Sequence, residues 1–162
     1  RPTDGWGRPP QRPLRLRMIA SWISGLHREN SDALGFIPMP TIDRQYVQQG
    51  RYVLQKDAKG RNVGYLLHGV IAPGRSVVLS QACIQHEKRL KGFGEEAVSA
   101  LVDRSKKSGA SSIRLRCAED TSAVKFWKHL GFNLERWEIP GNKRNRRIAV
   151  MSKPLMLPLF QQ

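Results

Sequence analysis

The stretch Arg89-Leu-Lys-Gly-Phe-Gly94 determines how the rest of this 162-residue sequence is interpreted. It lies between an apolar run at Val77–Ile84 and a helical apolar pattern that extends from Gly94 to Gly109. Paired glycines let the backbone approach a phosphate closely, and the first amides of a helix point outward without helical partners. The helix dipole adds partial positive charge at the same place. The stretch therefore predicts a pyrophosphate cradle, which the side chains of Arg89 and Lys91 can reinforce.

Two other kinds of phosphate-binding loop do not fit this spacing. A Walker loop requires Gly-Lys-Ser/Thr four residues after its first glycine, and a dinucleotide-binding loop requires a third glycine. The stretch from Arg89 to Gly94 meets neither requirement. A basic loop with glycines is by itself also typical of a simple turn, so the neighbouring elements must decide.

The neighbouring elements predict an α/β fold. We expect strands at Leu14–Ile19, Tyr52–Gln55, Val63–His68, Val77–Ile84, Ile113–Cys117, Phe132–Ile139 and Arg147–Met151. We expect helices at Ser21–Arg28, Thr41–Gln48, Gly94–Gly109 and Ala123–Leu130. Together they predict a mixed central sheet of about six to seven strands with helices on both faces. Residues 1–13, rich in Pro, Gly and Arg, would form an irregular basic arm, and residues 14–162 a single domain.

The run from Ser76 to Phe132 resembles the core of the GNAT superfamily of acyl-CoA transferases. Its loop from Arg89 to Gly94 fits the family pattern Gln/Arg-x-x-Gly-x-Gly/Ala at every fixed position. The segment from Ala123 to Phe132 resembles the family's second motif, a helix that ends Phe-Tyr-x-x-x-Gly-Phe. The resemblance implies a GNAT-like fold and an N-acyltransferase. Such an enzyme moves an acetyl or similar group from acetyl-CoA, or another acyl-CoA, to an amine by direct attack.

The resemblance also implies roles for individual residues. The backbone of Ile84 would hold the pantetheine arm, and the amide of Ala82 would donate to the thioester oxygen as an oxyanion donor. Phe126 and Trp127 stand at core spacing, with contact to the cofactor as a second role. Beside Arg89, the pyrophosphate would be bound by the backbone amides of Leu90, Lys91, Gly92, Phe93 and Gly94.

Three departures from the family pattern concern catalysis. Trp127 replaces the tyrosine that protonates the departing thiolate, so water would do this or the thiolate would leave unaided. Asp120 replaces a frequent asparagine and would either hydrogen-bond near the cofactor or cap the following helix, a role that Thr121 could also take. The run Val77–Ile84 contains no acid, and its polar side chains Ser80 and Gln81 could orient a substrate or a water.

Other side chains are weaker candidates. Those considered as a general base or substrate contact are His86, Glu87, His68 and Tyr46. Cys83 could be imagined as an acyl carrier, but no His or acid lies close in sequence to activate it, which favours buried packing.

Composition limits the remaining possibilities. The two cysteines and four histidines show no metal-ligand spacing, and no apolar run reaches the ~20 residues that span a bilayer. We therefore expect no metal, no membrane span, and free thiols in a reducing, cytoplasmic setting. The formal charge of +15 favours a polyanionic partner such as nucleic acid. A homodimer is possible.

The acceptor amine is left open. A basic segment before the last strand would repel polyamines and lysine-rich tails and suit an anionic acceptor; it carries Lys143, Arg144, Arg146 and Arg147. Two alternatives to a transferase for small molecules or proteins remain. One is a relative that modifies a nucleobase or an amine linked to nucleic acid. The other is a non-catalytic module that binds nucleic acid or a protein assembly.

Overall fold

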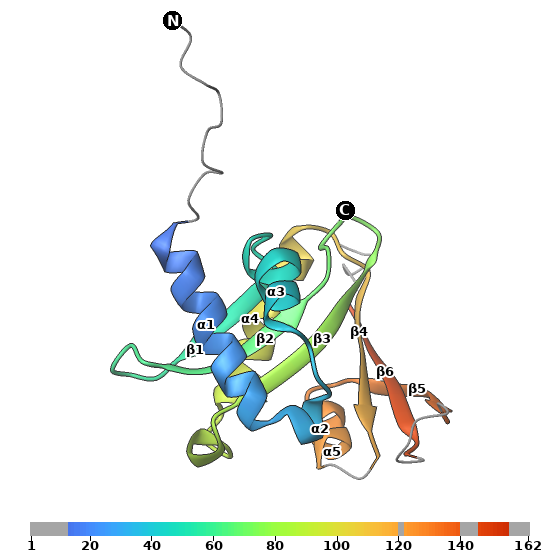
Figure 1. Cartoon of the computed structure of the whole chain (residues 1–162). Helices are drawn as coiled ribbons and strands as arrows, with labels where there is room; N and C mark the ends of the chain where they lie inside the picture. Colours follow the sequence, from blue (N-terminus) through green and yellow to red (C-terminus); the bar gives the residue numbers. More distant parts are fainter. Residues whose placement is uncertain (1–12, 120–121, 140–145, 156–162) are drawn as a thin grey trace, which may run out of the picture.

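The computed structural model describes residues 13–119, 122–139 and 146–155 (Figure 1). The first half contains α1 (Leu14–Glu29), α2 (Ser31–Leu34), α3 (Met39–Thr41), the π-helix η1 (Ile42–Val47), β1 (Tyr52–Lys56) and β2 (Asn62–His68). The second half contains β3 (Ser76–Ile84), the 3₁₀ turn η2 (His86–Lys88), α4 (Phe93–Lys107), β4 (Ser112–Ala118), α5 (Ala123–His129), β5 (Asn133–Glu138) and β6 (Ile148–Pro154). The predicted α/β class is confirmed.

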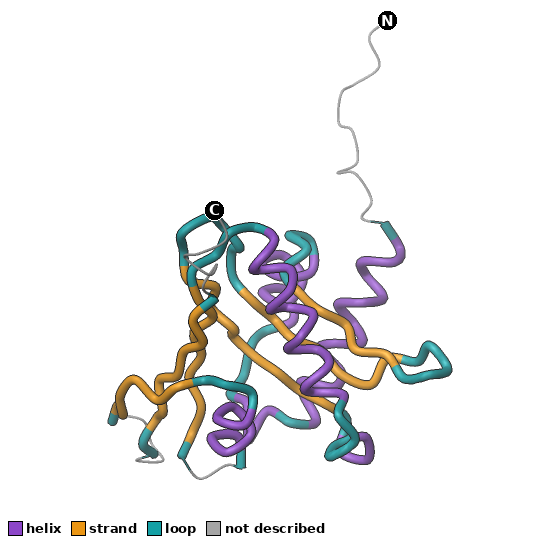
Figure 2. The backbone as a smooth tube through the Cα atoms, turned by 180° about the vertical axis from the view of Figure 1, so that it is seen from behind, coloured by secondary structure: helices purple, strands orange, loops and turns teal. Residues whose placement is uncertain are grey.

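The strands form one mixed sheet in the order β1-β2-β3-β4-β6-β5. Its neighbours are antiparallel except for β3 and β4, which are parallel and are joined through α4. The described part of the chain thus has six strands, within the predicted range. Seen from opposite sides, α1 lies on one face of the sheet and α4 on the other (Figures 1 and 2).

Each face of the sheet has its own apolar core. On the first face α1 and η1 pack on β2, and the buried residues are Ile19, Ala20, Ile23, Leu26, Ile42, Val47, Tyr65, Leu67 and Cys83. On the second face α4 and α5 pack on β3, β4 and β6 around Leu101, Ile113 and Met151. Helices therefore cover both faces, as predicted, and the sheet between them is fixed from two sides.

The strand predicted at Leu14–Ile19 is wrong, because these residues form the first turns of α1. Ile19, Ile23 and Leu26 recur at helical spacing and are all buried against the sheet. The apolar residues whose alternation suggested a strand are not buried together, since Leu14 is 68% exposed and Met18 is 63% exposed. Leu, Arg and Met are also good helix formers, so the helical pattern extends back to Leu14.

The other elements confirm the predictions. The expected helix at Ser21–Arg28 is the second half of α1, and the one at Thr41–Gln48 is found as the π-helix η1. Residues 1–12, together with Asp120, Thr121, Lys143 and Arg144, lie outside the described residues, so the predictions made for them stay predictions. In the described ranges, no helix is long and apolar enough to cross a membrane, and no three His, Cys, Asp or Glu side chains are placed to hold a metal.

β2 and β3 approach each other closely at Gly64. It pairs with Ile84, and a Cβ atom on Gly64 would lie 2.2 Å from Ile84 Cδ1 and 2.8 Å from the carbonyl oxygen of Cys83. The second of these neighbours is backbone and cannot rotate away. A residue without a side chain is therefore required at this position.

Candidate functional site

The parallel strands β3 and β4 separate halfway along their length. They pair only from Ser76 to Leu79, opposite Ser112–Leu115. Beyond that point β3 stays paired with β2 as far as Ile84, whereas β4 stays paired with β6 as far as Ala118. A gap between two strands of the same sheet opens as a result.

A bulge at Ser80 changes the orientation of β3 where the gap begins. His68 pairs with Leu79 but the preceding Leu67 pairs with Gln81, so Ser80 is an extra residue on β3. Before the bulge Leu79 belongs to the core beneath α4 and α5. After it, Ala82 lies on that same face, and Cys83 belongs to the core beneath α1.

The backbone of β3 presents polar groups to this gap. The amide of Gln85 donates to the carbonyl of Val63 on the β2 side at 2.8 Å. Because backbone groups alternate in direction along an antiparallel strand, Cys83 also faces β2, and Ala82 and Ile84 face β4. These are the two residues whose backbone was predicted to hold the thioester and the pantetheine arm. Both face away from β2, and their roles stay predictions.

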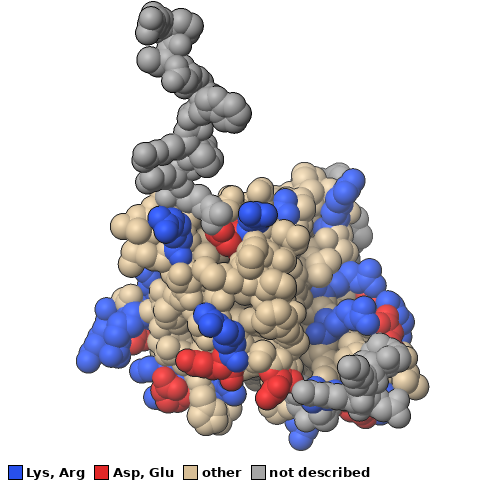
Figure 3. All heavy atoms as spheres, in the orientation of Figure 1, with Lys and Arg blue, Asp and Glu red and all other residues tan. Residues whose placement is uncertain are grey.

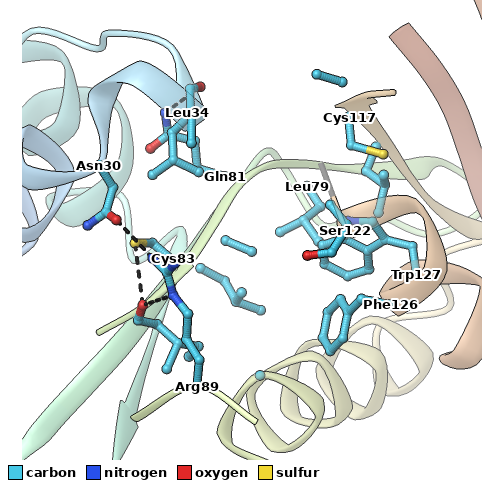
Figure 4. A pocket seen from close by; sticks show the side chains of 18 of the residues that line it. Asn30, Leu34, Leu79, Gln81, Cys83, Arg89, Cys117, Ser122, Phe126 and Trp127 are labelled. Carbon is cyan, nitrogen blue, oxygen red and sulfur yellow. Dashed lines mark hydrogen bonds between the residues drawn. The ribbon is translucent and has the colours of Figure 1, made fainter. Parts of the chain in front are cut away.

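The gap leads into a pocket of about 1360 Å³ (Figure 4). Most of the predicted site residues line it together: Ser80, Gln81, Ala82, Ile84, Arg89, Leu90, Gly92, Phe93, Gly94, Phe126 and Trp127. Lys91 does not line it in the described structure and is exposed on the loop. The predicted loop, strand and second motif thus meet at one site although they are separated in the sequence.

The start of α4 gives the loop its shape. Gly92 precedes the helix with φ 85°, in the left-handed region that favours glycine. Leu90 also has a positive φ of 62°, and its side chain is fully exposed. Within the described residues no side chain caps α4, so the amides of its first turn remain available to an anion.

The side chain of Arg89 ties the loop to the end of α1. Its Nη2 donates to Oδ1 of Asn30 at 2.8 Å, and its Nε donates to the carbonyl oxygen of Ile84 at 3.0 Å (Figure 4). Asn30 in turn donates through Nδ2 to the carbonyl of Leu26. Sequence reasoning missed Asn30, because nothing local links it to a loop 59 residues away. That the guanidinium reinforces phosphate binding stays a prediction.

Gly94 lets α4 close against α5. A Cβ atom on Gly94 would lie 3.1 Å from Cζ of Phe126 and 3.8 Å from Cγ1 of Ile84. Phe126 is half-buried and lines the pocket. Trp127 is 6% exposed and packs edge-on against Phe132 with ring centroids 5.2 Å apart. Packing is thus the main role of Trp127, as predicted.

Ser80 and Gln81 have different surroundings. The hydroxyl of Tyr46, from η1, donates to Ser80 Oγ at 3.0 Å. Gln81 is buried, donates to the carbonyl of Gly35 at 3.2 Å and accepts from the hydroxyl of Tyr65 at 3.2 Å. Gln81 therefore links β3 to β2 and to the segment after α2, whereas Ser80 accepts from Tyr46, and its role toward a substrate stays a prediction.

The residues considered as a general base do not all line the pocket. His68 is 2% exposed and does not line the pocket in the described structure; its Nδ1 donates to the carbonyl of Gly69 and its Nε2 accepts from Arg104. His86 and Glu87 also lie outside the pocket lining. The carboxylates that line it are Asp32 and Glu95, which were not considered as bases from the sequence.

Two buried histidines predict a loss of stability in mild acid. Burial lowers the pKa of His68 and of His27 below the ordinary value of 6.5, because a protonated imidazole loses its hydration. The unfolded chain therefore binds more protons as the pH falls through 6.5, and stability decreases with it. We expect the free energy of unfolding, measured with urea, to fall between about pH 7 and pH 5. A His27→Gln/His68→Gln variant should show a flatter dependence, and His129→Gln, at an exposed position, should not. An unchanged slope in the double variant would contradict this account.

Solved structures with the same architecture include acetyltransferases. Ard1 from Thermoplasma volcanium has a TM-score of 0.72 at 13% identity, over 85% of this chain and 92% of that one. The ribosomal-protein-S18-alanine N-acetyltransferase from Escherichia coli has a TM-score of 0.69 at 17% identity, over 92% of this chain and 93% of that one. The structure of yncA from Salmonella typhimurium, with its cofactor acetyl-CoA, has a TM-score of 0.73 at 16% identity, over 87% of this chain and 91% of that one. At these identities the likeness defines the fold, that of the acetyltransferase class.

The sequence itself identifies the family. A search of the curated proteins finds no match to the chain. A model of the acetyltransferase (GNAT) family, however, matches residues 17–132, which is well over half of its length. The protein therefore belongs to the acetyltransferase (GNAT) family. The resemblance noted at the loop and at the segment Ala123–Phe132 is thereby confirmed.

Proposed function

We propose that this chain is an acetyl-CoA-dependent N-acetyltransferase that transfers the acetyl group by direct attack of an amine. The observation that carries the proposal is the backbone edge of β3 at Ala82 and Ile84, which β4 leaves unpaired, beside the amides that begin α4. An extended pantetheine arm can pair with the first while the pyrophosphate rests on the second. One pocket of about 1360 Å³ contains both, which suits a cofactor of this size.

The chemistry requires little of the side chains. The amine nitrogen attacks the carbonyl carbon, the carbon–sulfur bond breaks, and the thiolate leaves with the electron pair of that bond. The nitrogen then loses a proton. Because Trp127 cannot act as an acid, water would carry this proton to the thiolate. The amide of Ala82 would stabilise the oxyanion, a contribution of about 3 kcal/mol in other acyl transfers.

Charged side chains outside the cofactor loop also line the pocket. Asp32, from α2, and the cations Arg116 and Arg146 line it. Arg116 is ion-paired with Glu138 on β5. We infer that Asp32 orients or deprotonates the amine, and that the arginines favour an acceptor with an anionic group.

An amine linked to nucleic acid is the second candidate acceptor, favoured by the net charge of +15. On the face shown in Figure 3, however, most Lys and Arg side chains lie apart from one another toward the rim, and uncharged residues cover most of the centre. Such a distribution suits weak, salt-dependent contact with phosphates better than a defined track.

The experiment that tests the function is a titration of acetyl-CoA into the protein by calorimetry, followed by an acceptor screen. The screen measures release of coenzyme A by chromatography with a polyamine, a lysine peptide, a peptide with a free amino terminus, an aminoglycoside and a short RNA. Micromolar binding with turnover of one class supports the proposal. A folded protein that does not bind acetyl-CoA would leave a binding module as the better account.

Direct attack predicts that Cys83 is dispensable for chemistry. Cys83 lines the pocket but is 5% exposed, and burial raises the pKa of its thiol to about 11. A thiol in that state is a poor nucleophile. We expect Cys83→Ala to retain kcat/KM within about threefold, or ~0.7 kcal/mol of barrier. Intact-mass spectrometry after exposure to acetyl-CoA should show no acetyl adduct at Cys83; a stoichiometric adduct lost in Cys83→Ala would contradict direct attack.

A further inference from the structure

A second hollow, of about 1160 Å³, lies at the opposite edge of the molecule from β5. We call it the edge groove and define it by Leu14, Arg15, Met18, Ile19, Trp22, Gly50, Tyr52, Val53, Leu54, Lys56, Asn62, Ala100 and Arg104. These residues come from α1, from the edge strand β1 and its flanks, from the start of β2 and from α4. Because α1 and α4 lie on opposite faces of the sheet, the groove straddles the sheet edge with a helix on each side (Figures 1 and 2).

The floor of the edge groove is a strand edge with available backbone groups. In the described structure β1 pairs with β2 alone. The amide of His68 donates to the carbonyl of Arg51, so the alternation of an antiparallel pair turns Tyr52 and Leu54 away from β2. Arg104 occupies the carbonyl of Tyr52 at 3.2 Å. The amide of Tyr52 and both backbone groups of Leu54 are left for an incoming strand.

The walls of the edge groove are apolar and its charge has one sign. Leu14 and Met18 are 68% and 63% exposed, which is unusual for large apolar side chains on the same helix face. The charged residues that line the groove are Arg15, Lys56 and Arg104, with no acid among the lining residues. The rest of α1 adds to this field, since its only acid is Glu29 at the far end.

We propose that the edge groove is the docking site for an extended, acidic segment of a partner protein, which adds to β1 as a further strand. Backbone pairing with Leu54 supplies affinity, apolar side chains pack on Leu14 and Met18, and acidic side chains meet Arg15 and Lys56. Charge argues against the other occupants. A second copy of the chain carries +15, and residues 1–12 carry three arginines and one acid.

The backbone part of the proposal is tested with a labelled octapeptide of alternating Val and Glu, followed by fluorescence anisotropy. Leu54→Pro removes the outward amide and leaves the pairing with β2 in place, since that amide does not face β2. Leu54→Ala is the matched control, because it removes the same side chain and keeps the amide. We expect Leu54→Pro to weaken peptide binding at least about tenfold relative to Leu54→Ala. Equal binding by the two variants would overturn the proposal.

The charge part is tested with surface variants that leave the fold intact. Arg15→Glu/Lys56→Glu should weaken binding of the acidic peptide at least about tenfold. The control Lys107→Glu/Lys128→Glu makes the same change in net charge at exposed positions outside the groove and should change binding less than about twofold. A peptide of alternating Val and Lys should not bind the parent protein.

Three further results of the peptide assays would also overturn the proposal: no binding of the Val-Glu peptide to the parent, equal losses in the two charge variants, or equal binding of the Val-Lys and Val-Glu peptides by the parent. Analytical sedimentation tests whether a second copy of the chain occupies the groove instead. A dimer of the parent that dissociates in Leu54→Pro would assign the groove to that second copy and overturn the proposal. The melting temperature of each variant shows that it is folded.

Discussion

Gly92→Asp is expected to weaken acetyl-CoA binding by about 100-fold or more. Gly92 has φ 85°, where a Cβ atom costs ~1–2 kcal/mol, so the loop is pushed away from its shape. The new carboxylate would also stand at the first turn of α4, where the pyrophosphate is proposed to rest, and two like charges ~4 Å apart repel by up to about 4 kcal/mol near a protein surface. Calorimetric titration measures the change directly.

The matched control for this variant is Gly60→Asp in the turn between β1 and β2. Gly60 has φ 76° and, like Gly92, has no atom within 4 Å of a built Cβ, so the two substitutions carry similar backbone strain. The control should bind acetyl-CoA as the parent does. If Gly92→Asp also binds normally, the cradle at the start of α4 is not the cofactor site.

The largest effect on stability is expected from Gly64→Ala. The added Cβ would lie 2.8 Å from the carbonyl oxygen of Cys83, so β2 and β3 must move apart. Overpacking of this kind costs about 1–3 kcal/mol, and the upper end applies here because the neighbour is backbone. Urea unfolding should show the loss, and the melting temperature should fall by about 2–4 °C for each kcal/mol.

Gly25→Ala is the comparison variant, and it is expected to raise the free energy of unfolding. Gly25 lies inside α1, and a Cβ built on it has nothing within 4 Å. Alanine in a helix interior is favoured over glycine by about 0.8–1.0 kcal/mol, so this variant should be more stable than the parent. If both variants were neutral, the closeness of β2 to β3 at Gly64 would not be a constraint.

Local patterns were enough to predict the loop, the strand and the second motif that line the pocket together. The loop at Arg89–Gly94 could be recognised because a strand, two glycines and an amphipathic helix occur in direct succession. The strand at Val77–Ile84 and the second motif at Ala123–Phe132 were predicted on the same grounds. Each depends on neighbouring residues, and tertiary packing supports the same choice.

The predictions that were wrong or missing concern residues whose positions depend on contacts between distant parts of the chain. Leu14–Ile19 alternates like a strand, but the sheet has no place that buries its side chains, and Ile19 and Ile23 draw the segment into α1. The bridge from Arg89 to Asn30 joins residues whose proximity only the fold creates. Asp32 enters the pocket for the same reason, because α2 is brought beside β3 by packing of α1 on the sheet.

The bulge at Ser80 sets which residues of β3 face the pocket. If the strand straightened and Ser80 paired with Leu67, the two sides of every residue that follows would be exchanged. Gln81 and Cys83 would then turn toward α4 and α5, and Ala82 and Ile84 would turn their backbone toward β2. Deletion of Ser80 would instead remove the bulge and keep Gln81 opposite Leu67, so the orientation of the pocket-facing half of β3 depends on its register and not on the side chain at the bulge.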